Sequence, residues 1–286
     1  MKFLVLGAGG MAGHLITIYL KEKGEDVIGL ATRNLSYCNS IVMNVTDFLK
    51  LEEIILKNHF DIIINCVGIL NQTAEANIDQ AILINSYLPH YLEKITTNIP
   101  TRIIHMSTDC VFSGKKGSYI ESDLPDGESV YDRTKALGEL NDNKNLTFRN
   151  SIIGPDIKCQ GIGLFNWFMK QSETITGYDK SIWNGVTTLT LAKAIHAAAY
   201  TNLSGIYHLV NNKTITKYEL LLLFKKYFNP NIEIIKVDGV NQDKSLINSR
   251  LDFKYIIQDY ETQVEEMYDW VMQHAEVYQH YSLKGN

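Results

Sequence analysis

A short apolar run that leads directly into a glycine-rich segment is the feature that most restricts how this chain can fold. Lys2–Leu6 reads K-F-L-V-L, which is typical of a strand buried on both faces, and a helical pattern follows over residues 14–23. The glycines between the strand and the helix have no side chains. They would allow a tight turn, close packing of helix on strand, and approach of the backbone to a pyrophosphate. We expect a dinucleotide's phosphates at five residues of this segment, G-A-G-G-M-A-G: Gly7, Gly9, Gly10, Met11 and Gly13.

Apolar runs continue to alternate with helical patterns along the first half of the chain. Strands are expected over residues 26–31, 42–44, 61–70, 102–106 and 146–153, and helices from residue 46 or 47, over 74–94 and over 129–140. This alternation predicts an α/β fold with a doubly wound parallel sheet of the Rossmann type. Ligands of such sheets bind at the carboxyl ends of the strands.

The sequence also predicts a smaller carboxyl-terminal lobe that binds the substrate. Residues 1–153 are expected to form the dinucleotide-binding domain, to which 185–212 return, and residues 154–184 and 213–286 the lobe. Trp183 lies in an Asn/Gly loop and could wall a sugar or base, while Lys244 and Arg250 could clamp a nucleotide diphosphate. Core packing of the tryptophan and a solvated loop around the two cations are the alternatives.

The end of the second expected strand bears on the choice of cofactor. NAD sites usually place an acidic residue there, but no Asp or Glu occurs between Gly29 and Tyr37. Thr32 and Arg33 occupy the region, and an arginine suits the 2′-phosphate of NADPH. We expect NADPH as cofactor and leave NADH open; an arginine without a ligand in a surface loop is the alternative.

Two further strand ends are candidates for the cofactor site. The third ends near Asn44 and Val45, which places both beside the adenine in a dinucleotide fold. The fourth is followed by Cys66, Val67 and Gly68, which suit a lining for the middle of the cofactor. An ordinary transition from strand to loop would explain the fourth equally well.

Residues 107–135 hold the candidate catalytic groups. Tyr131 and Lys135 are four residues apart on an expected helix, so both side chains can reach one ligand. A nearby ammonium favours the phenolate and lowers the tyrosine pKa towards the range useful for proton exchange with a carbonyl oxygen. A hydroxyl of Thr108 or Ser107 could hydrogen-bond the same oxygen. The pattern indicates carbonyl reduction or alcohol oxidation; a surface tyrosine beside a solvated lysine is the alternative.

Composition excludes several other classes of protein. The 286 residues carry a net charge of −5 and contain no basic block, so nucleic acid is not an expected partner. No apolar stretch reaches the length of about 18 residues that a membrane span needs, and glycines interrupt residues 1–20, unlike in a signal peptide. The four cysteines have no metal-binding spacing. We expect a cytoplasmic protein with no membrane partner and no metal site.

Taken in order, the glycine loop, N-C-V-G, S-T-D-C-V-F-S-G and Y-D-R-T-K resemble the extended short-chain dehydrogenase/reductases, in particular the dTDP-4-dehydrorhamnose reductase group. The resemblance covers essentially the whole chain. It implies that Tyr131 is the catalytic acid, that Lys135 holds the cofactor ribose, and that Thr108 orients the substrate carbonyl. We place Ser107, Asp109 and Val111 of the same motif at a nucleotide-sugar substrate.

Some positions depart from the pattern of that group. Ile152 stands where rhamnose-forming members usually have tryptophan, and Cys110 replaces a commoner tyrosine. The chain is also similar to a branch that handles UDP-linked 2-acetamido-2,6-dideoxy-L-sugars. The expected reaction is therefore reduction of the C4 keto group of a 4-keto-6-deoxy-L-hexosyl nucleotide, dTDP- or UDP-linked, for surface polysaccharide synthesis.

Two other functions are compatible with the resemblance. A 4-epimerase of the same fold would keep a tightly bound NAD and need no external reductant. A non-catalytic regulatory subunit of methionine adenosyltransferase resembles the same reductase group, although the complete set of Thr108, Tyr131 and Lys135 argues against a loss of chemistry. A homodimer is left open.

Overall fold

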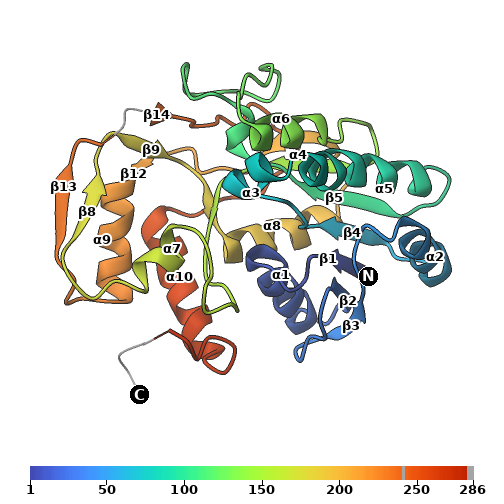
Figure 1. Cartoon of the computed structure of the whole chain (residues 1–286), viewed down its shortest axis with the longest axis horizontal. Coiled ribbons are helices and arrows are strands. Elements are labelled where there is room, and N and C mark those ends of the chain that lie inside the picture. Colours follow the sequence, from blue (N-terminus) through green and yellow to red (C-terminus); the bar gives the residue numbers. More distant parts are fainter. Residues whose placement is uncertain (240–241, 282–286) are drawn as a thin grey trace.

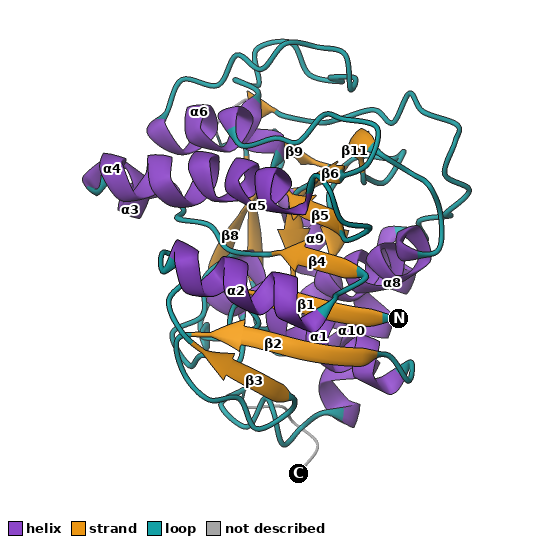
Figure 2. Ribbon diagram, turned by 90° about the vertical axis from the view of Figure 1, so that its right-hand side faces the viewer, coloured by secondary structure: helices purple, strands orange, loops and turns teal. Residues whose placement is uncertain are grey.

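A seven-stranded parallel sheet forms the centre of the computed structural model, which describes residues 1–239 and 242–281. The strand order is β11-β6-β5-β4-β1-β2-β3, and Figure 2 shows several of these strands side by side. The order reverses between β1 and β4, which creates the switch point where such sheets bind ligands. The bounds are β1 Lys2–Leu6, β2 Asp26–Ala31, β3 Asn39–Val42, β4 Ile62–Asn65, β5 Arg102–Met106, β6 Leu146–Arg149 and β11 Gly205–His208.

Helices cover both faces of this sheet because its strands are apolar on both sides. Along β1, Phe3 and Val5 pack into one hydrophobic core, with α1 (Met11–Glu22) and α8 (Thr188–Ala199). Leu4 and Leu6 pack into a second core, with α2 (Phe48–Asn58) and α5 (Leu88–Thr96). In Figure 1, α5 lies on the opposite side of the strands from α1 and α8. The prediction of a doubly wound α/β sheet is confirmed.

The connection between β4 and β5 differs from the single helix expected over residues 74–94. It consists of α3 (Asn71–Ala76), α4 (Ile78–Ala81), a π-helical segment (Ile82–Tyr87) and α5. The widened turn contains Asn85, whose fully buried side chain bonds both the N–H and the C=O of Ile69. This inward amide joins the segment to the loop after β4, and π-helical turns often occur at functional sites.

The remaining elements form three small sheets and several helices beside the main sheet (Figure 1). β10 pairs with β7, β9 lies between β12 and β14, and β13 pairs with β8. Their bounds are β7 Ile152–Ile153, α7 Leu164–Phe168, β8 Ile175–Tyr178, β9 Ser181–Trp183, β10 Val186–Thr187, β12 Ile215–Thr216, α9 Lys217–Tyr227, β13 Ile234–Val237, β14 Gln242–Asp243 and α10 Tyr260–Gln273.

These elements pack against the α1 and α8 face of the main sheet. Phe165, Phe224 and Trp270 belong to the same hydrophobic core as Phe3 and Val5. β11 pairs with β6, so the chain returns to the main sheet at residues 205–208. The expected strand over 146–153 is split, because residues 152–153 leave the main sheet to pair with β10. We propose that residues 154–184 and 213–286 act as the substrate lobe, beside a dinucleotide-binding part formed by 1–153 and 185–212.

Within the described residues, no helix has the length and apolar character that crossing a membrane requires.

Candidate active site

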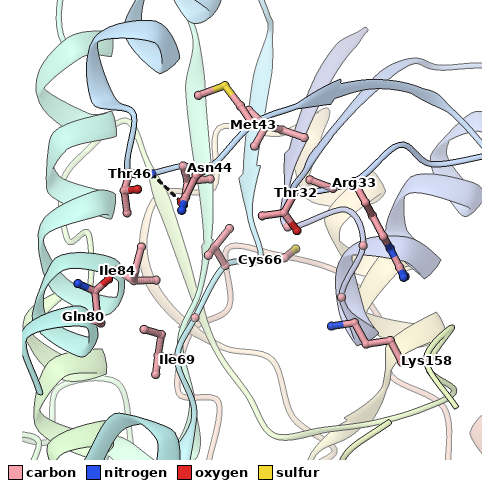
Figure 3. Close-up of a pocket in the computed structure, with 18 residues that line it drawn as sticks. Thr32, Arg33, Met43, Asn44, Thr46, Cys66, Ile69, Gln80, Ile84 and Lys158 are labelled. Carbon is pink, nitrogen blue, oxygen red and sulfur yellow. Dashed lines mark hydrogen bonds between the residues drawn. The ribbon is translucent and has the colours of Figure 1, made fainter. Parts of the chain in front are cut away.

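A cavity of about 540 Å³ opens at the switch point, along the carboxyl ends of β1, β2, β3 and β4 (Figure 3). Strand ends from four separate parts of the sequence meet here because all four strands run parallel. The cavity collects nine of the residues predicted to bind a cofactor: Gly7, Gly9, Gly10, Arg33, Asn44, Val45, Cys66, Val67 and Gly68.

The glycine loop has the geometry of a phosphate cradle. Gly7 adopts a φ of 76°, a conformation that side chains disfavour. A Cβ added to Gly13 would lie 2.2 Å from the carbonyl oxygen of Gly7, so only glycine permits this packing of loop on helix. Helix α1 begins immediately after Gly10, which turns its free N–H groups towards the loop. These features fit the pyrophosphate of a dinucleotide.

Arg33 lines the cavity directly after β2, beside Thr32. Its Nε would lie 4.0 Å from a Cβ added to Gly9, so the guanidinium group extends over the glycine loop. No Asp or Glu is among the described residues that line the cavity. A cation without a neighbouring carboxylate at this position fits a 2′-phosphate better than a free ribose hydroxyl.

Sequence reasoning missed part of the cavity lining. Thr46 follows Asn44, whose side-chain oxygen accepts a hydrogen bond from the Thr46 N–H at 3.1 Å. Gln80 and Ile84 reach the cavity from the segment after β4, where a spacing of four residues is the only local signal. Lys158 comes from a loop that local sequence patterns do not connect with the sheet. The other unpredicted residues are Leu30, Ala31, Thr32, Met43 and Ile69.

Helix α6 (Val130–Leu137) carries the predicted tyrosine and lysine. It starts with a capping box, in which the Ser129 hydroxyl accepts from the Asp132 N–H at 3.0 Å and the Asp132 carboxylate accepts from the Ser129 N–H at 3.3 Å. This cap fixes where the helix begins and therefore where Tyr131 and Lys135 point. Both are buried, with 8% and 4% of their surfaces exposed.

Tyr131 lies close to Thr108, as expected for groups that act on one carbonyl oxygen. Burial raises the pKa of Tyr131 above its usual range, and the Thr108 hydroxyl opposes that rise only in part. The sequence had predicted a lowered pKa. That prediction was wrong for this arrangement, because burial raises the pKa of Tyr131 and the charges of Cys110, Asp109 and Asp132 act in the same direction. A phenol in this state is protonated at neutral pH and can act as an acid.

The Lys135 side chain reaches the end of β5. Its ammonium group donates to the carbonyl oxygen of Met106 at 2.5 Å and lies 3.4 Å from Nε2 of His105. Burial lowers the pKa of Lys135 to about 8, while the charge of Glu139 opposes the decrease. The His105 ring also contacts Asn65, with 3.2 Å between Nδ1 and the amide nitrogen. Lys135 is therefore charged at neutral pH but close to losing its proton.

Ser107 belongs to a buried polar network. Its hydroxyl donates to Glu139 at 2.6 Å, and the same carboxylate accepts two hydrogen bonds from Arg149, at 2.7 and 2.8 Å. The Arg149 guanidinium group also lies over the ring of Phe112, 5.1 Å from its centre. These contacts give Ser107 structural partners. The Thr108 hydroxyl also has partners, since it donates to the Asp109 carboxylate and accepts from the Cys110 N–H, both at 3.1 Å, but it lies beside Tyr131.

Asp109 and Lys244, both predicted to bind the substrate, lie near each other. Asp109 is beside Thr108, and its backbone N–H donates to the carbonyl oxygen of Asn150 at 3.3 Å. Burial raises the pKa of Asp109, and the positive charge of Lys244 acts in the opposite direction. The amide nitrogen of Asn150 is buried and has no hydrogen-bond partner among the described residues. Asn150, which sequence reasoning missed, therefore offers an unused donor at the carboxyl end of β6.

Of the other three, the structure places Val111 and Arg250 elsewhere. Val111 is fully buried in a core with Leu246, and Trp183 packs on Tyr260 with ring centres 5.7 Å apart. Arg250 donates to the carbonyl oxygens of Ser204 and Ile206 at the start of β11, where the strand is furthest from the active-site edge. A polar sequence stretch does not reveal which end of a sheet it meets. We leave Val111 and Arg250 out of the proposed site, and Trp183 stays a proposed substrate contact.

No group of three or more His, Cys, Asp or Glu side chains suited to a metal ion occurs in the described part of the chain.

A dinucleotide cradle at the switch point of a parallel sheet, with Tyr131, Lys135 and Thr108 at an adjacent strand end, defines an extended short-chain dehydrogenase/reductase fold. The profile of the RmlD substrate binding domain family matches residues 1–266. The chain belongs to this family, and its predicted resemblance to the dTDP-4-dehydrorhamnose reductase group is confirmed.

Named relatives are nucleotide-sugar and polysaccharide enzymes. The chain is 30% identical over 226 residues to the spore coat polysaccharide biosynthesis protein SpsK of Bacillus subtilis, and the match covers 76% of each protein. It is 31% identical over 144 residues to dTDP-4-dehydrorhamnose reductase of Mycobacterium tuberculosis, which covers 48% of this chain and 44% of that enzyme. The structure of dTDP-4-dehydrorhamnose reductase from Bacillus anthracis in complex with NADP superimposes with a TM-score of 0.78, at 20% identity, over 94% of this chain and 99% of that one.

Proposed function

We propose that this protein is an NADPH-dependent reductase of the C4 keto group of a nucleotide-linked 4-keto-6-deoxy-hexose. The observation that carries the proposal is the closeness of Tyr131 and Thr108 at the end of β5, next to a cavity with a glycine cradle. Names of the relatives support the class of reaction, because they include dTDP-4-dehydrorhamnose reductase. The NADP complex of the B. anthracis enzyme supports the cofactor.

The residues divide the work of carbonyl reduction between them. Bound NADPH supplies a hydride to the C4 carbon. Tyr131, protonated at neutral pH, gives its proton to the oxygen as negative charge develops there. Thr108 hydrogen-bonds the same oxygen and holds the carbonyl in reach. The buried charge of Lys135 stabilises the phenolate that remains. In our proposal Lys135 also holds the cofactor ribose, a role implied by the family.

The sugar nucleotide is proposed as a dTDP- or UDP-linked 4-keto-6-deoxy-L-hexose used in making a surface polysaccharide. The name of SpsK, a spore coat polysaccharide biosynthesis protein, supports a polysaccharide product. Asp109, Lys244 and Asn150 are proposed to contact the substrate, because they lie around the strand ends beside Thr108. The homodimer that the sequence leaves open does not affect this assignment.

A panel of dTDP- and UDP-linked 4-keto-6-deoxy sugars, incubated with enzyme and NADPH, tests the proposal. We expect NADPH oxidation in proportion to the sugar reduced, with NMR showing a new hydroxyl at C4. Epimerised sugar formed without NADPH consumption, or no conversion of any member of the panel, would contradict it.

A further inference from the structure

Lys158 reaches the cofactor cavity from a different part of the chain than the rest of its lining. Every other lining residue falls between Gly7 and Ile84, at the ends of β1 to β4 and in the segment after β4. Lys158 lies in the loop that follows β7, at the start of the proposed substrate lobe. In Figure 3 its ammonium group points into the cavity on the side occupied by Arg33.

Hydrogen bonds hold the Lys158 loop in a compact turn. The carboxylate of Asp156, which is buried, accepts from the Lys158 N–H at 3.0 Å. The Gly161 N–H donates to the Lys158 carbonyl oxygen at 2.8 Å and closes the turn. Asn166, just beyond it, contacts the sulfur of Met11 at 3.9 Å. Helix α7, which follows the turn, therefore lies against the first residue of α1, where the glycine loop ends.

The charge around the cavity favours an anionic ligand. Arg33 and Lys158 are the two cations among its described lining residues, and that lining contains no carboxylate. A cavity with two cations and no acidic group concentrates positive potential. The ammonium group of a lysine is a compact charge that suits phosphate oxygens.

We propose that Lys158 binds a phosphate group of the bound dinucleotide, so that the lobe contacts the cofactor directly. The inference rests on the proposed function only for the identity of the cofactor. Two phosphate groups of the dinucleotide could accept this contact: the 2′-phosphate beside Arg33, and the diphosphate at the glycine loop.

Calorimetric titration of the whole protein with NADPH and with NADH tests the inference without any sugar substrate. The variants are Lys158→Gln, Lys158→Arg and, as a matched control, Lys180→Gln, which removes an exposed lobe cation paired with Asp238 at 2.5 Å. We expect Lys158→Gln to weaken NADPH binding about threefold to tenfold, since the group is exposed and its contact screened. Lys158→Arg should bind NADPH with nearly the affinity of the parent protein. Lys180→Gln should bind it with unchanged affinity.

The two cofactors identify which phosphate is bound. A loss of affinity for NADPH alone in Lys158→Gln supports the inference and assigns the contact to the 2′-phosphate. An equal loss for NADPH and NADH also supports it and assigns the contact to the diphosphate. Unchanged dissociation constants for both cofactors in Lys158→Gln overturn the inference while the proposed function stands. A parent protein that binds neither cofactor overturns both.

Discussion

Arg149 and Glu139 form a buried ion pair, with 2.7 Å between the guanidinium and carboxylate groups and side chains only 2% and 5% exposed. The carboxylate also accepts the hydroxyl of Ser107, the residue before Thr108. The pair therefore ties β6 to the segment that follows α6 and to the end of β5. An ion pair in this setting holds the catalytic strand end in place only while both charges are present.

Replacing Glu139 with Gln should destabilise the protein by about 3 kcal/mol, because it leaves the Arg149 charge buried without its partner. Urea unfolding at pH 7 measures the change. The control is Glu128→Gln, which removes the carboxylate of the exposed Lys115–Glu128 pair and should leave the unfolding midpoint nearly unchanged. Equal midpoints for the two variants would count against a structural role for the buried pair.

The pH dependence of activity should report Lys135. Its pKa is lowered to about 8, so the stabilising positive charge is present below that pH and is lost as the pH rises through it. We expect kcat/KM to fall on the alkaline side with an apparent pKa of about 8. The Glu139 charge opposes the lowering, so Glu139→Gln should move this fall to lower pH in whatever fraction remains folded. If kcat/KM of Glu139→Gln falls at the same pH as in the parent enzyme, the group that titrates is not Lys135.

Gly13→Ala tests the glycine cradle. The added methyl group would lie 2.2 Å from the Gly7 carbonyl oxygen, so the loop must move away from α1. We expect loss of NADPH binding and a lower melting temperature. In Gly9→Ala the methyl group would meet its nearest neighbours at 3.6 Å, an ordinary contact, so its melting temperature should match the parent's. Normal cofactor affinity in Gly13→Ala would show that the loop does not hold phosphates.

Arg33 should set the preference between cofactors. Arg33→Ala is expected to weaken NADPH binding about tenfold or more, since it removes a charged hydrogen bond to the 2′-phosphate, and to leave NADH binding nearly unchanged. Titration of both cofactors measures the ratio. A parent enzyme that works clearly better with NADH than with NADPH would contradict this assignment.

Local patterns were sufficient to predict the sheet and the centre of the site. The apolar run before Gly7 gave the first strand, and the four-residue spacing of Tyr131 and Lys135 placed both on one helix. These features depend on neighbours in sequence, where strand and helix periodicity are directly visible. Parallel strands then bring their carboxyl ends together, so residues at those ends were also predicted to meet.

Contacts between distant segments were not predictable in the same way. Asn85 donates to the hydroxyl of Thr134 at 3.1 Å, and a Cβ on Gly138 would lie 1.9 Å from the Asn85 carbonyl oxygen. This close approach fixes α6 against the π-helical segment, yet neither residue carries a local signal for it. Lys158 and Arg250 illustrate the same limit: their positions depend on how the lobe folds back on the sheet.

In the proposed reaction, Tyr131 donates the proton in reduction of a sugar ketone. The most direct measurement is the sugar-dependent rate of NADPH oxidation by the parent enzyme and by Tyr131→Phe, beside the NADPH dissociation constant of each. We expect the rate to fall by about a hundredfold or more, while the dissociation constant changes by less than about twofold. A Tyr131→Phe enzyme that reduces the sugar at the parent rate would contradict the account.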